Sequence, residues 1–144
     1  MNKVFQSCGA SVIIYKDNKI LLQQRKDNKC WGYHGGHVEI GEKVEDTARR
    51  ELLEETGLTA LSLELFGVFS GPELRHVYPD GNEVHIIDIV YLCDEFEGEM
   101  KPQSSEVLEL KWFDIEEIPE MLSPPIIPAL KKFVEIKKLS KRNT

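Results

Sequence analysis

The chain has 144 residues, of which 41% are hydrophobic and 30% are charged, and its net charge is -7; this length and composition fit one globular domain over residues 1–144. The acidic balance argues against stable nucleic-acid binding, which needs a basic face. Because no apolar run approaches the roughly 20 residues that cross a bilayer, and no leader sequence is recognisable at the N-terminus, we expect a cytoplasmic protein without membrane association.

The N-terminal part of the chain predicts a β-hairpin followed by a glycine-rich segment. Residues 7–25 read SCGASVIIYKDNKILLQQR, in which two apolar runs flank a polar DN pair. Apolar runs rich in β-branched residues on either side of a polar turn are typical of two paired strands. A short extended piece at 31–34 then leads into Gly35 and Gly36.

Residues 44–56 carry the clearest helical pattern of the chain. Val44, Ala48 and Leu52 recur every four residues, which places them in one apolar stripe on a helix. Gly57 follows directly, at the position where a left-handed C-terminal cap is expected. The pattern therefore predicts a helix over 44–56 that packs through this stripe and ends at the glycine.

The rest of the chain predicts alternating strands and short helical pieces. Strands are expected at 61–70, 84–96 and 107–113, with a turn at the sequence YPDGNE between the first two. The sequence DIEEIPEM predicts a short helical turn, and a final helix is expected over 126–139, with Pro128 in its first turn. Helices placed between strands in this way predict an α/β or α+β fold.

The helix at 44–56 contains more carboxylates than its own arginines neutralise. Side chains three or four residues apart on a helix touch, so Glu45 and Asp46 each meet an arginine four residues later, whereas Glu51 and Glu55 have no basic partner at these spacings. Like charges at i,i+4 cost a few tenths of a kcal/mol, and burial raises the cost. Mg²⁺ or Mn²⁺ would offset the repulsion; a solvated acidic face is the alternative.

Residues 36–58 resemble the Nudix box, written G-x5-E-x7-R-E-U-x-E-E-x-G-U, in which U is bulky and apolar. The positions that match are Gly36, Glu42, Arg50, Glu51, Leu52, Glu54, Glu55, Gly57 and Leu58. A weaker resemblance, in the strand order and the segment LELKWFDIEEIP, extends to most of the chain and points to MutT-like and ADP-ribose pyrophosphatase-like hydrolases. It implies an α/β/α sandwich with a mixed β-sheet, in which the box forms a loop-helix-loop.

The activity that the resemblance implies is Mg²⁺-dependent hydrolysis of a nucleoside diphosphate linked to another moiety, such as ADP-ribose, a nucleotide sugar or a (d)NTP. An 8-oxo-dGTP-type sanitising enzyme is the alternative within the family. It is weakened because rough alignment puts Ser123 where MutT-like proteins offer an asparagine to the oxidised purine. A nucleotide-sensing module without catalysis is the alternative of another class, disfavoured because every glutamate of the box is present. The resemblance is also compatible with a homodimer, since relatives are often dimers.

The resemblance also assigns roles to residues of the box. The metal ligands it implies are Gly36 through its backbone carbonyl, Glu51, Glu54 and Glu55. Glu51 is either a ligand or the base that orients water, and Arg50 holds the glutamates through charge-assisted hydrogen bonds. Many relatives have Pro-Gly-Gly where this chain has His-Gly-Gly, which loosens the loop without removing a ligand.

Four residues outside this set complete the expected site. Glu42 is expected to support Arg50, and Glu106, in a later loop, to act as a further ligand or base. Arg25, at the end of the second expected strand, is expected to contact a phosphate of the substrate, and Tyr78 to stack on its base. The residues expected to act in catalysis are thus Arg50, Glu51, Glu54 and Glu106.

Overall fold

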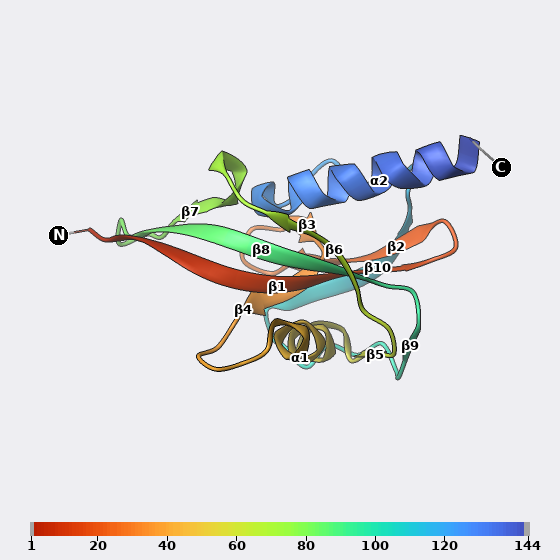
Figure 1. The fold of residues 1–144 in the computed structure, drawn as a ribbon, viewed down its shortest axis with the longest axis horizontal. Helices are drawn as coiled ribbons and strands as arrows, with labels where there is room; N and C mark the ends of the chain where they lie inside the picture. Colours follow the sequence, from red (N-terminus) through yellow and green to blue (C-terminus); the bar gives the residue numbers. More distant parts are fainter. Residues whose placement is uncertain (1, 143–144) are drawn as a thin grey trace.

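A mixed β-sheet lies between two helices in the computed structural model, which describes residues 2–142 of the chain (Figure 1). The expected α/β fold with a mixed sheet between helices is confirmed. The strands and helices are β1 (Val4–Lys16), β2 (Lys19–Arg25), β3 (Trp31–Gly32), β4 (His34–His37), α1 (Val44–Thr56), β5 (Thr59–Ala60), β6 (Glu64–Phe69), β7 (Arg75–Val77), β8 (Glu83–Cys93), β9 (Phe96–Glu97), β10 (Val107–Asp114) and α2 (Ile127–Arg142). Single 3₁₀ turns lie at Pro72–Leu74 and Pro124–Ile126.

The long strand β1 organises the sheet, whose strand order is β10-β2-β1-β8-β6. Strand β8 runs parallel to β1 along nearly its whole length, and the other pairings are antiparallel. On the opposite edge of β1, residues 9–12 pair with the glycine-rich strand β4, whereas Tyr15 and Lys16 pair with β2. This division brings β4 beside the middle of β1, where α1 packs against both strands.

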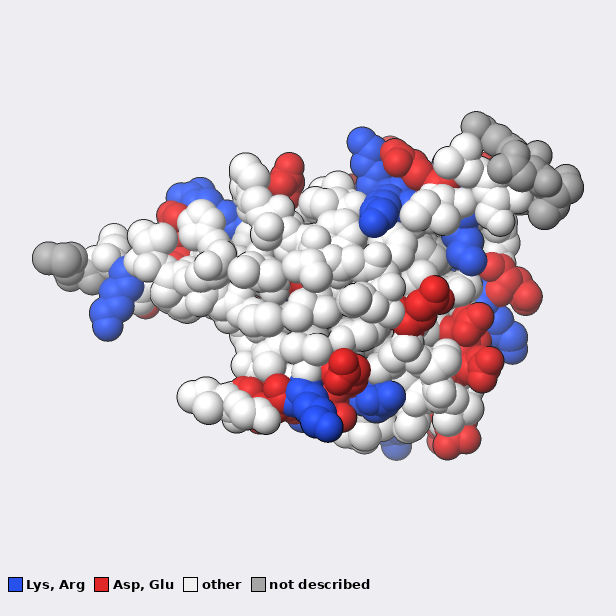
Figure 2. All heavy atoms as spheres, viewed as in Figure 1, with Lys and Arg blue, Asp and Glu red and all other residues white. Residues whose placement is uncertain are grey.

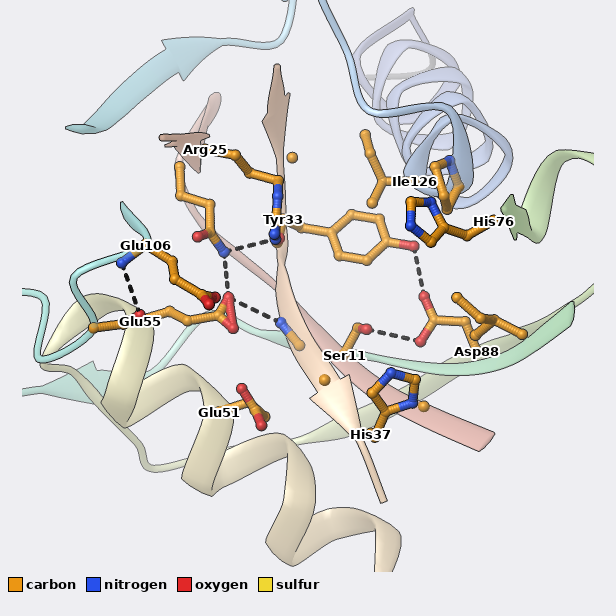
Figure 3. A pocket seen from close by; sticks show the side chains of 18 of the residues that line it. Ser11, Arg25, Tyr33, His37, Glu51, Glu55, His76, Asp88, Glu106 and Ile126 are labelled. Atoms are coloured by element: carbon orange, nitrogen blue, oxygen red, sulfur yellow. Dashed lines mark hydrogen bonds between the residues drawn. The ribbon is translucent and has the colours of Figure 1, made fainter. Parts of the chain in front are cut away.

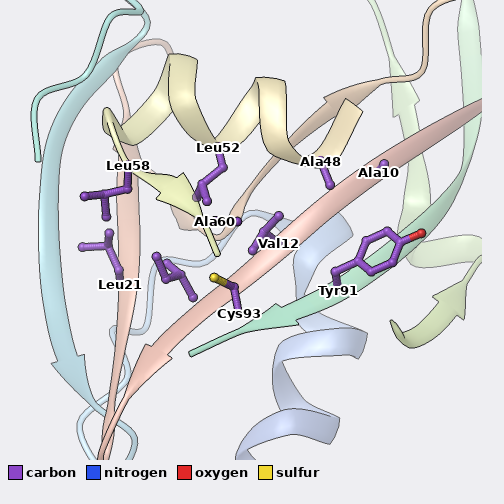
Figure 4. Packing of buried hydrophobic residues seen from close by; sticks show 10 residues of the cluster. Ala10, Val12, Leu21, Ala48, Leu52, Leu58, Ala60, Tyr91 and Cys93 are labelled. Atoms are coloured by element: carbon purple, nitrogen blue, oxygen red, sulfur yellow. The ribbon is translucent and has the colours of Figure 1, made fainter. Parts of the chain in front are cut away.

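Each face of the sheet carries its own hydrophobic cluster. Side chains alternate across a strand, so Val12 and Ile14 of β1 face α1, whereas Ile13 faces α2. Ala48 and Leu52, the predicted stripe of α1, are fully buried against the first cluster (Figure 4). Burying a leucine side chain contributes about 1.5–3 kcal/mol. This packing fixes α1 on the sheet and thereby sets which way its acidic residues point.

The predicted helix at 44–56 is confirmed residue for residue, and its cap is the expected one. Gly57 has a φ of 82°, and its N–H donates to the carbonyl of Leu53 at 2.8 Å. A Cβ at Gly57 would lie 2.5 Å from the carbonyl oxygen of Lys101. Glycine is therefore required both by the backbone conformation and by the chain that passes over this end of the helix.

Two of the expected strands differ from those observed. The strand expected over 61–70 begins only at Glu64, because the N–H groups of Leu61 and Ser62 both donate to the carbonyl of Glu95. The strand expected over 84–96 starts one residue earlier and ends at Cys93. The final helix, expected over 126–139, begins at Ile127 after a 3₁₀ turn and extends to Arg142.

The helical turn expected for residues 114–121 is wrong. The N–H of Glu116 donates to Asp114 Oδ1 at 2.9 Å, and the N–H of Glu117 donates to the Asp114 carbonyl at 2.8 Å. The N–H of Ile115 donates to Asn18 in the β1–β2 turn at 3.0 Å. These bonds hold the segment as a turn against the hairpin, and Pro119 has no N–H with which to extend a helix.

The surface drawn in Figure 2 mixes charges of both signs. Most basic side chains on this face lie beside acidic ones, and no continuous basic area is visible there. Neither α1 nor α2, the helices of the described residues, combines the length and the apolar character that a membrane-spanning helix requires.

Candidate functional site

A pocket of about 910 Å³ opens between α1, the strands β1, β4 and β8, and the 3₁₀ turn that precedes α2 (Figure 3). Its lining is acidic at one end and aromatic at the other. We call the acidic end the part lined by Arg25, Arg50, Glu51, Glu54, Glu55 and Glu106. We call the aromatic end the part lined by Tyr33, His37, Leu74, His76, Tyr78 and Ile126. Gly35 and Gly36 lie between the two ends, on β4.

Glu55 points from α1 into the pocket and is the most deeply placed acid of the acidic end. Its carboxylate accepts hydrogen bonds from the side-chain amide of Gln23 and, at 3.3 Å, from the N–H of Gly35. The pKa of Glu55 is raised to about 8, mainly by burial and in addition by the nearby charge of Glu51. Two carboxylates held together in a partly buried place are destabilising unless they are neutralised, and a bound cation would neutralise them.

Glu51 lies directly against the backbone of Gly36. A Cβ at Gly36 would stand 2.5 Å from both Cδ and Oε1 of Glu51, which is far inside van der Waals contact. Only glycine therefore allows this carboxylate to reach the wall of the pocket. The close approach brings the side chain of Glu51 and the peptide groups of β4 to the same point at the acidic end.

Arg50 connects the acidic residues to one another. Its Nε donates to Glu42 Oε2 at 2.9 Å, its Nη1 donates to Glu51 Oε1 at 2.9 Å, and Nη1 lies 3.6 Å from Glu54 Oε1. The expected pairing of Glu42 with Arg50 is found. The expectation that Glu51 has no basic partner on the helix is wrong, because the long side chain of its neighbour Arg50 curls back to reach it.

The neutralising pairs expected on α1 are also different from those observed. Arg49 lies 3.8 Å from Asp46, three residues earlier, and Glu45 instead accepts a hydrogen bond from the hydroxyl of Tyr91 at 3.3 Å. Arg50 turns away from Asp46, because it is engaged by the acids at the pocket. The central arginine of α1 thus binds acids at the pocket rather than acids on the solvent-exposed face of the helix.

Replacing Glu42 with glutamine is expected to destabilise the protein at neutral pH and to lose this effect in acid. Hydrogen bonds from Arg50 and then Thr47 lower the pKa of Glu42 from 4.5 to about 2. A carboxyl group whose pKa is lower in the folded state stabilises that state fully above its unfolded pKa, and this contribution disappears as the pH falls through the folded pKa. Urea unfolding of wild type and Glu42→Gln at about pH 7, and in steps between about pH 5 and pH 2.5, measures it.

The matched control for this experiment is Glu39→Gln. Glu39 lies 3.8 Å from the same guanidinium of Arg50, but its side chain is 71% exposed, so solvent screens the pair. We expect little change for Glu39→Gln at any pH. A stability difference between wild type and Glu42→Gln that stays constant from neutral pH into acid would contradict the role given to the pair.

The remaining expected residues lie at the edges of the pocket. Arg25 lines it from the end of β2 while its Nε donates to Asp27 Oδ1 at 3.1 Å. Glu106 is exposed on the loop between β9 and β10, and with Glu54 it lines a second, smaller cavity of about 430 Å³. Tyr78 packs edge-on against His76, with ring centroids 4.6 Å apart. Eight of the nine expected site residues thus line the pocket, from five separate segments, whereas Glu42 supports Arg50 without lining it.

Sequence reasoning missed the residues that support the acidic end from behind. Gln23 on β2 donates to Glu55 and lies 3.1 Å from Nδ1 of His34. Nε2 of His34 lies 3.0 Å from the carbonyl of Leu21, so this nitrogen carries the proton and Nδ1 accepts from the amide. Full burial lowers the pKa of His34 to about 4, which keeps the ring neutral. His34, which replaces the proline of many relatives, thus orients the amide that holds Glu55.

Sequence reasoning also missed the polar floor at the aromatic end. Asp88 accepts hydrogen bonds from Ser11 Oγ at 2.7 Å and from the Tyr33 hydroxyl at 2.9 Å. The available signal was a single carboxylate in the otherwise apolar run IIDIV of β8. Ser123, which directly precedes the 3₁₀ turn before α2, is buried. Its hydroxyl has no hydrogen-bond partner within the described part of the chain.

The oxygen donors of the acidic end suit a hard divalent cation. Within residues 2–142, no three His, Cys, Asp or Glu side chains meet closely enough to form a complete metal cage by themselves. A cation there would combine carboxylates with a backbone carbonyl and with oxygens of water or substrate. A set in which oxygens of water and substrate complete the protein's carboxylates is the kind that Mg²⁺ uses at phosphate-binding sites.

The chain matches one protein family and is similar to several known proteins. The family model described as NUDIX domain matches residues 7–135. The chain is 42% identical over 112 residues to the ADP-ribose pyrophosphatase of Methanocaldococcus jannaschii. This match covers 76% of the chain and 62% of that relative. It is 34% identical over 112 residues to the oxidized purine nucleoside triphosphate hydrolase of Danio rerio, which covers 75% of the chain and 66% of that relative.

A solved structure supports the same similarity at the level of the fold. The MutT NUDIX hydrolase from Burkholderia pseudomallei superposes with a TM-score of 0.75 at 30% identity, covering 88% of this chain and 96% of that one. The chain spans less than two thirds of the length of the two curated relatives named above.

Proposed function

We propose, since this chain belongs to the Nudix family, that it hydrolyses the pyrophosphate of a nucleoside diphosphate linked to a second moiety, with ADP-ribose as the leading substrate. The observation that carries the proposal is the acidic end of the pocket, where Glu51 and Glu55 lie together against the glycines of β4. The similarity to a relative named ADP-ribose pyrophosphatase supports the choice of substrate. In this reaction water attacks one phosphorus, the bridging P–O bond breaks, and two phosphate monoesters leave.

The activating cation that we assign to the acidic end is Mg²⁺, with Mn²⁺ as a substitute. Its ligands would be the carboxylates of Glu51, Glu54 and Glu55 with the backbone carbonyl of Gly36, all hard oxygen donors. The contact between Glu51 and Gly36 supports this set, since it leaves no room for a side chain between carboxylate and backbone. When bound, such a cation withdraws charge from the phosphate oxygens and the leaving group.

Hydrogen bonds from neighbouring residues orient these ligands. Arg50 fixes Glu51 from one side through a bond of 2.9 Å, and Gln23 and the N–H of Gly35 fix Glu55 from the other. Partners that orient ligands in this way set the affinity and activity of metal sites. The buried helix stripe and the neutral His34 keep these partners in place.

Residues at the rim would handle substrate and proton. Arg25, whose side chain is 42% exposed, can turn from Asp27 to a phosphate, for which a guanidinium offers paired donors. Glu106 lines the smaller cavity together with Glu54 and is open to solvent, so we assign to Glu106 the uptake of the proton from the attacking water. The rings at the aromatic end, Tyr78 among them, offer the nucleoside a surface on which to stack.

Hydrolysis of a nucleotide panel tests this proposal. The panel holds ADP-ribose, a nucleotide sugar, dGTP and 8-oxo-dGTP, and phosphate-containing products are measured with Mg²⁺, with Mn²⁺ and with EDTA. We expect turnover with either cation, the highest kcat/KM for ADP-ribose, and no turnover in EDTA. Full activity in EDTA would contradict the metal assignment.

The same panel separates the proposal from its two alternatives. A higher kcat/KM for 8-oxo-dGTP than for ADP-ribose would favour the sanitising enzyme, which the Danio rerio relative supports by name. Against it, Ser123 offers a single buried hydroxyl oxygen, whereas an asparagine would offer a separate carbonyl acceptor and NH₂ donor side by side. Tight nucleotide binding without turnover under every metal condition would instead identify a sensing module.

A further inference from the structure

The floor of the aromatic end contains a buried carboxylate that the proposed reaction does not use. Asp88 lies in the middle of β8, is only 6% exposed, and lines the pocket (Figure 3). Its neighbours along the strand are apolar. Burial of a carboxylate among such residues is costly unless hydrogen bonds or charges compensate it, so its presence at this position calls for an explanation in terms of binding.

The hydrogen bonds within the protein satisfy only part of this carboxylate. Ser11 Oγ donates to Oδ1 at 2.7 Å, and the Tyr33 hydroxyl donates to Oδ2 at 2.9 Å. A carboxylate accepts about four hydrogen bonds, so each oxygen keeps acceptor capacity. Across residues 2–142, no lysine, arginine or histidine forms an ion pair with Asp88. Two hydroxyl groups therefore hold the carboxylate in a fixed orientation without neutralising it.

Glycines keep the space around this carboxylate open. A Cβ at Gly35 would overlap with Ser11 Oγ, the group that orients Asp88. A Cβ at Gly9 would lie 3.7 Å from Asp88 Oδ1 and 3.4 Å from the carbonyl oxygen of Gly36. The carboxylate of Asp88 and the carbonyl of Gly36 therefore both lie beside Gly9, which lines the pocket.

We propose that Asp88 is a specificity-determining residue that accepts hydrogen bonds from ribose hydroxyl groups of the substrate, and that Ser11 and Tyr33 are positioning residues for its carboxylate. The inference rests on the proposed function, because it takes the pyrophosphate to lie at the acidic end. In a nucleotide the sugar is attached directly to the phosphates and the base lies beyond it. A group close to the Gly36 carbonyl is therefore placed to meet the sugar before the base.

The chemistry of the two groups is complementary. An ionised carboxylate only accepts hydrogen bonds, whereas the 2′- and 3′-hydroxyls of a ribose can both donate; acidic side chains bind ribose hydroxyls in the same way in dinucleotide-binding folds. A sugar that lacks the hydroxyl leaves the buried carboxylate with an unsatisfied acceptor. Loss of a hydrogen bond to a charged group predicts binding weaker by roughly 10- to 100-fold.

Calorimetric titration with deoxy analogues of ADP-ribose tests the proposal. Wild type is titrated without added metal with ADP-ribose, with the analogue that lacks the 2′-hydroxyl of the adenosine ribose, and with the analogue that lacks the 2′-hydroxyl of the terminal ribose. We expect one of the two analogues to bind roughly 10- to 100-fold more weakly, which also identifies the ribose that Asp88 meets. Equal binding of all three ligands, or no binding of ADP-ribose, would overturn the proposal.

Variants assign the discrimination to Asp88. In Asp88→Asn, the affinity for ADP-ribose divided by the affinity for the more weakly bound deoxy analogue should fall toward one. Asp94→Asn, the same change at an exposed acid just beyond the same strand, should keep the wild-type ratio. Tyr33→Phe removes one positioning hydroxyl at nearly constant volume and should reduce the ratio to an intermediate value. An unchanged ratio in Asp88→Asn would overturn the assignment to ribose. The assignment would also be overturned if Asp88→Asn altered only the preference for a nucleotide with adenine over one with hypoxanthine.

Hydrolysis measured on the same proteins keeps the two proposals separate. Turnover of ADP-ribose without discrimination between ribose and deoxyribose would overturn the role of Asp88 and leave the proposed function in place. Discrimination in binding without turnover would support the role of Asp88 and count against hydrolysis.

Discussion

Glu55→Gln is expected to reduce kcat on ADP-ribose by at least about 100-fold while leaving the fold intact. Changes to residues that merely orient metal ligands cost about 10- to 100-fold, and Glu55 is assigned as a ligand itself. The amide oxygen of the glutamine can still accept from Gln23 and Gly35, as the carboxylate does. The substitution thus removes charge from the acidic end without removing its hydrogen bonds.

The stability of the same variant provides a second readout. Without metal, Glu55 is a buried acid beside Glu51, and its raised pKa of about 8 reports the unfavourable burial. An amide in its place is neutral without having to bind a proton, and it can donate to Glu51. We therefore expect the Tm of Glu55→Gln in EDTA to equal or exceed that of wild type.

The control for this variant is Glu45→Gln, on the first turn of the same helix and away from the pocket. We expect wild-type kcat for the control. Wild-type kcat for Glu55→Gln would contradict its assignment as a ligand. A large drop in Tm together with lost activity would show that Glu55 is needed for folding rather than for chemistry.

Gly36→Ala is expected to have an effect of similar size through geometry alone. The added Cβ would stand 2.5 Å from Cδ and Oε1 of Glu51, so either the carboxylate or the backbone of β4 must shift. A displacement of about 1 Å at a reacting centre can cost about 100-fold in rate. We expect a loss of kcat of about 100-fold or more, with weaker Mg²⁺ activation.

Gly32→Ala is the matched control for this change. Gly32 also lines the pocket, but a Cβ there would lie 3.4 Å from the nearest atom, in the side chain of Ile126, which is ordinary contact. Steady-state kinetics over a range of Mg²⁺ concentrations, with far-UV circular dichroism as a check on folding, compare the two variants. Equal activity of Gly36→Ala and Gly32→Ala would show that Glu51 need not lie against the glycine.

The elements that could be predicted from sequence are those with a local cause. The stripe of Val44, Ala48 and Leu52 and the left-handed conformation of Gly57 follow from local sequence, and α1 was predicted at its observed bounds. The resemblance of residues 36–58 to the Nudix box predicted which residues gather at the acidic end of the pocket. The turn at 114–121 was mispredicted because its hydrogen bonds to Asn18 come from a distant part of the chain.

The parts of the site that sequence reasoning missed depend on contacts between distant strands. Asp88 and Ser11 are 77 residues apart and meet only because β1 and β8 are parallel neighbours. Gln23 reaches Glu55 across the gap between β2 and α1. Helix geometry also misled in one place, since neighbours in sequence do not face each other on a helix, yet Arg50 is long enough to reach Glu51.

A crystal soaked in Mn²⁺ and measured where manganese scatters anomalously tests the central claim most directly, namely that the carboxylates beside the glycine strand hold a divalent cation. We predict an anomalous peak within coordination distance of Glu51, Glu55 and the carbonyl oxygen of Gly36. A well-ordered crystal with no peak there, and with the two carboxylates directed apart into solvent, would contradict it.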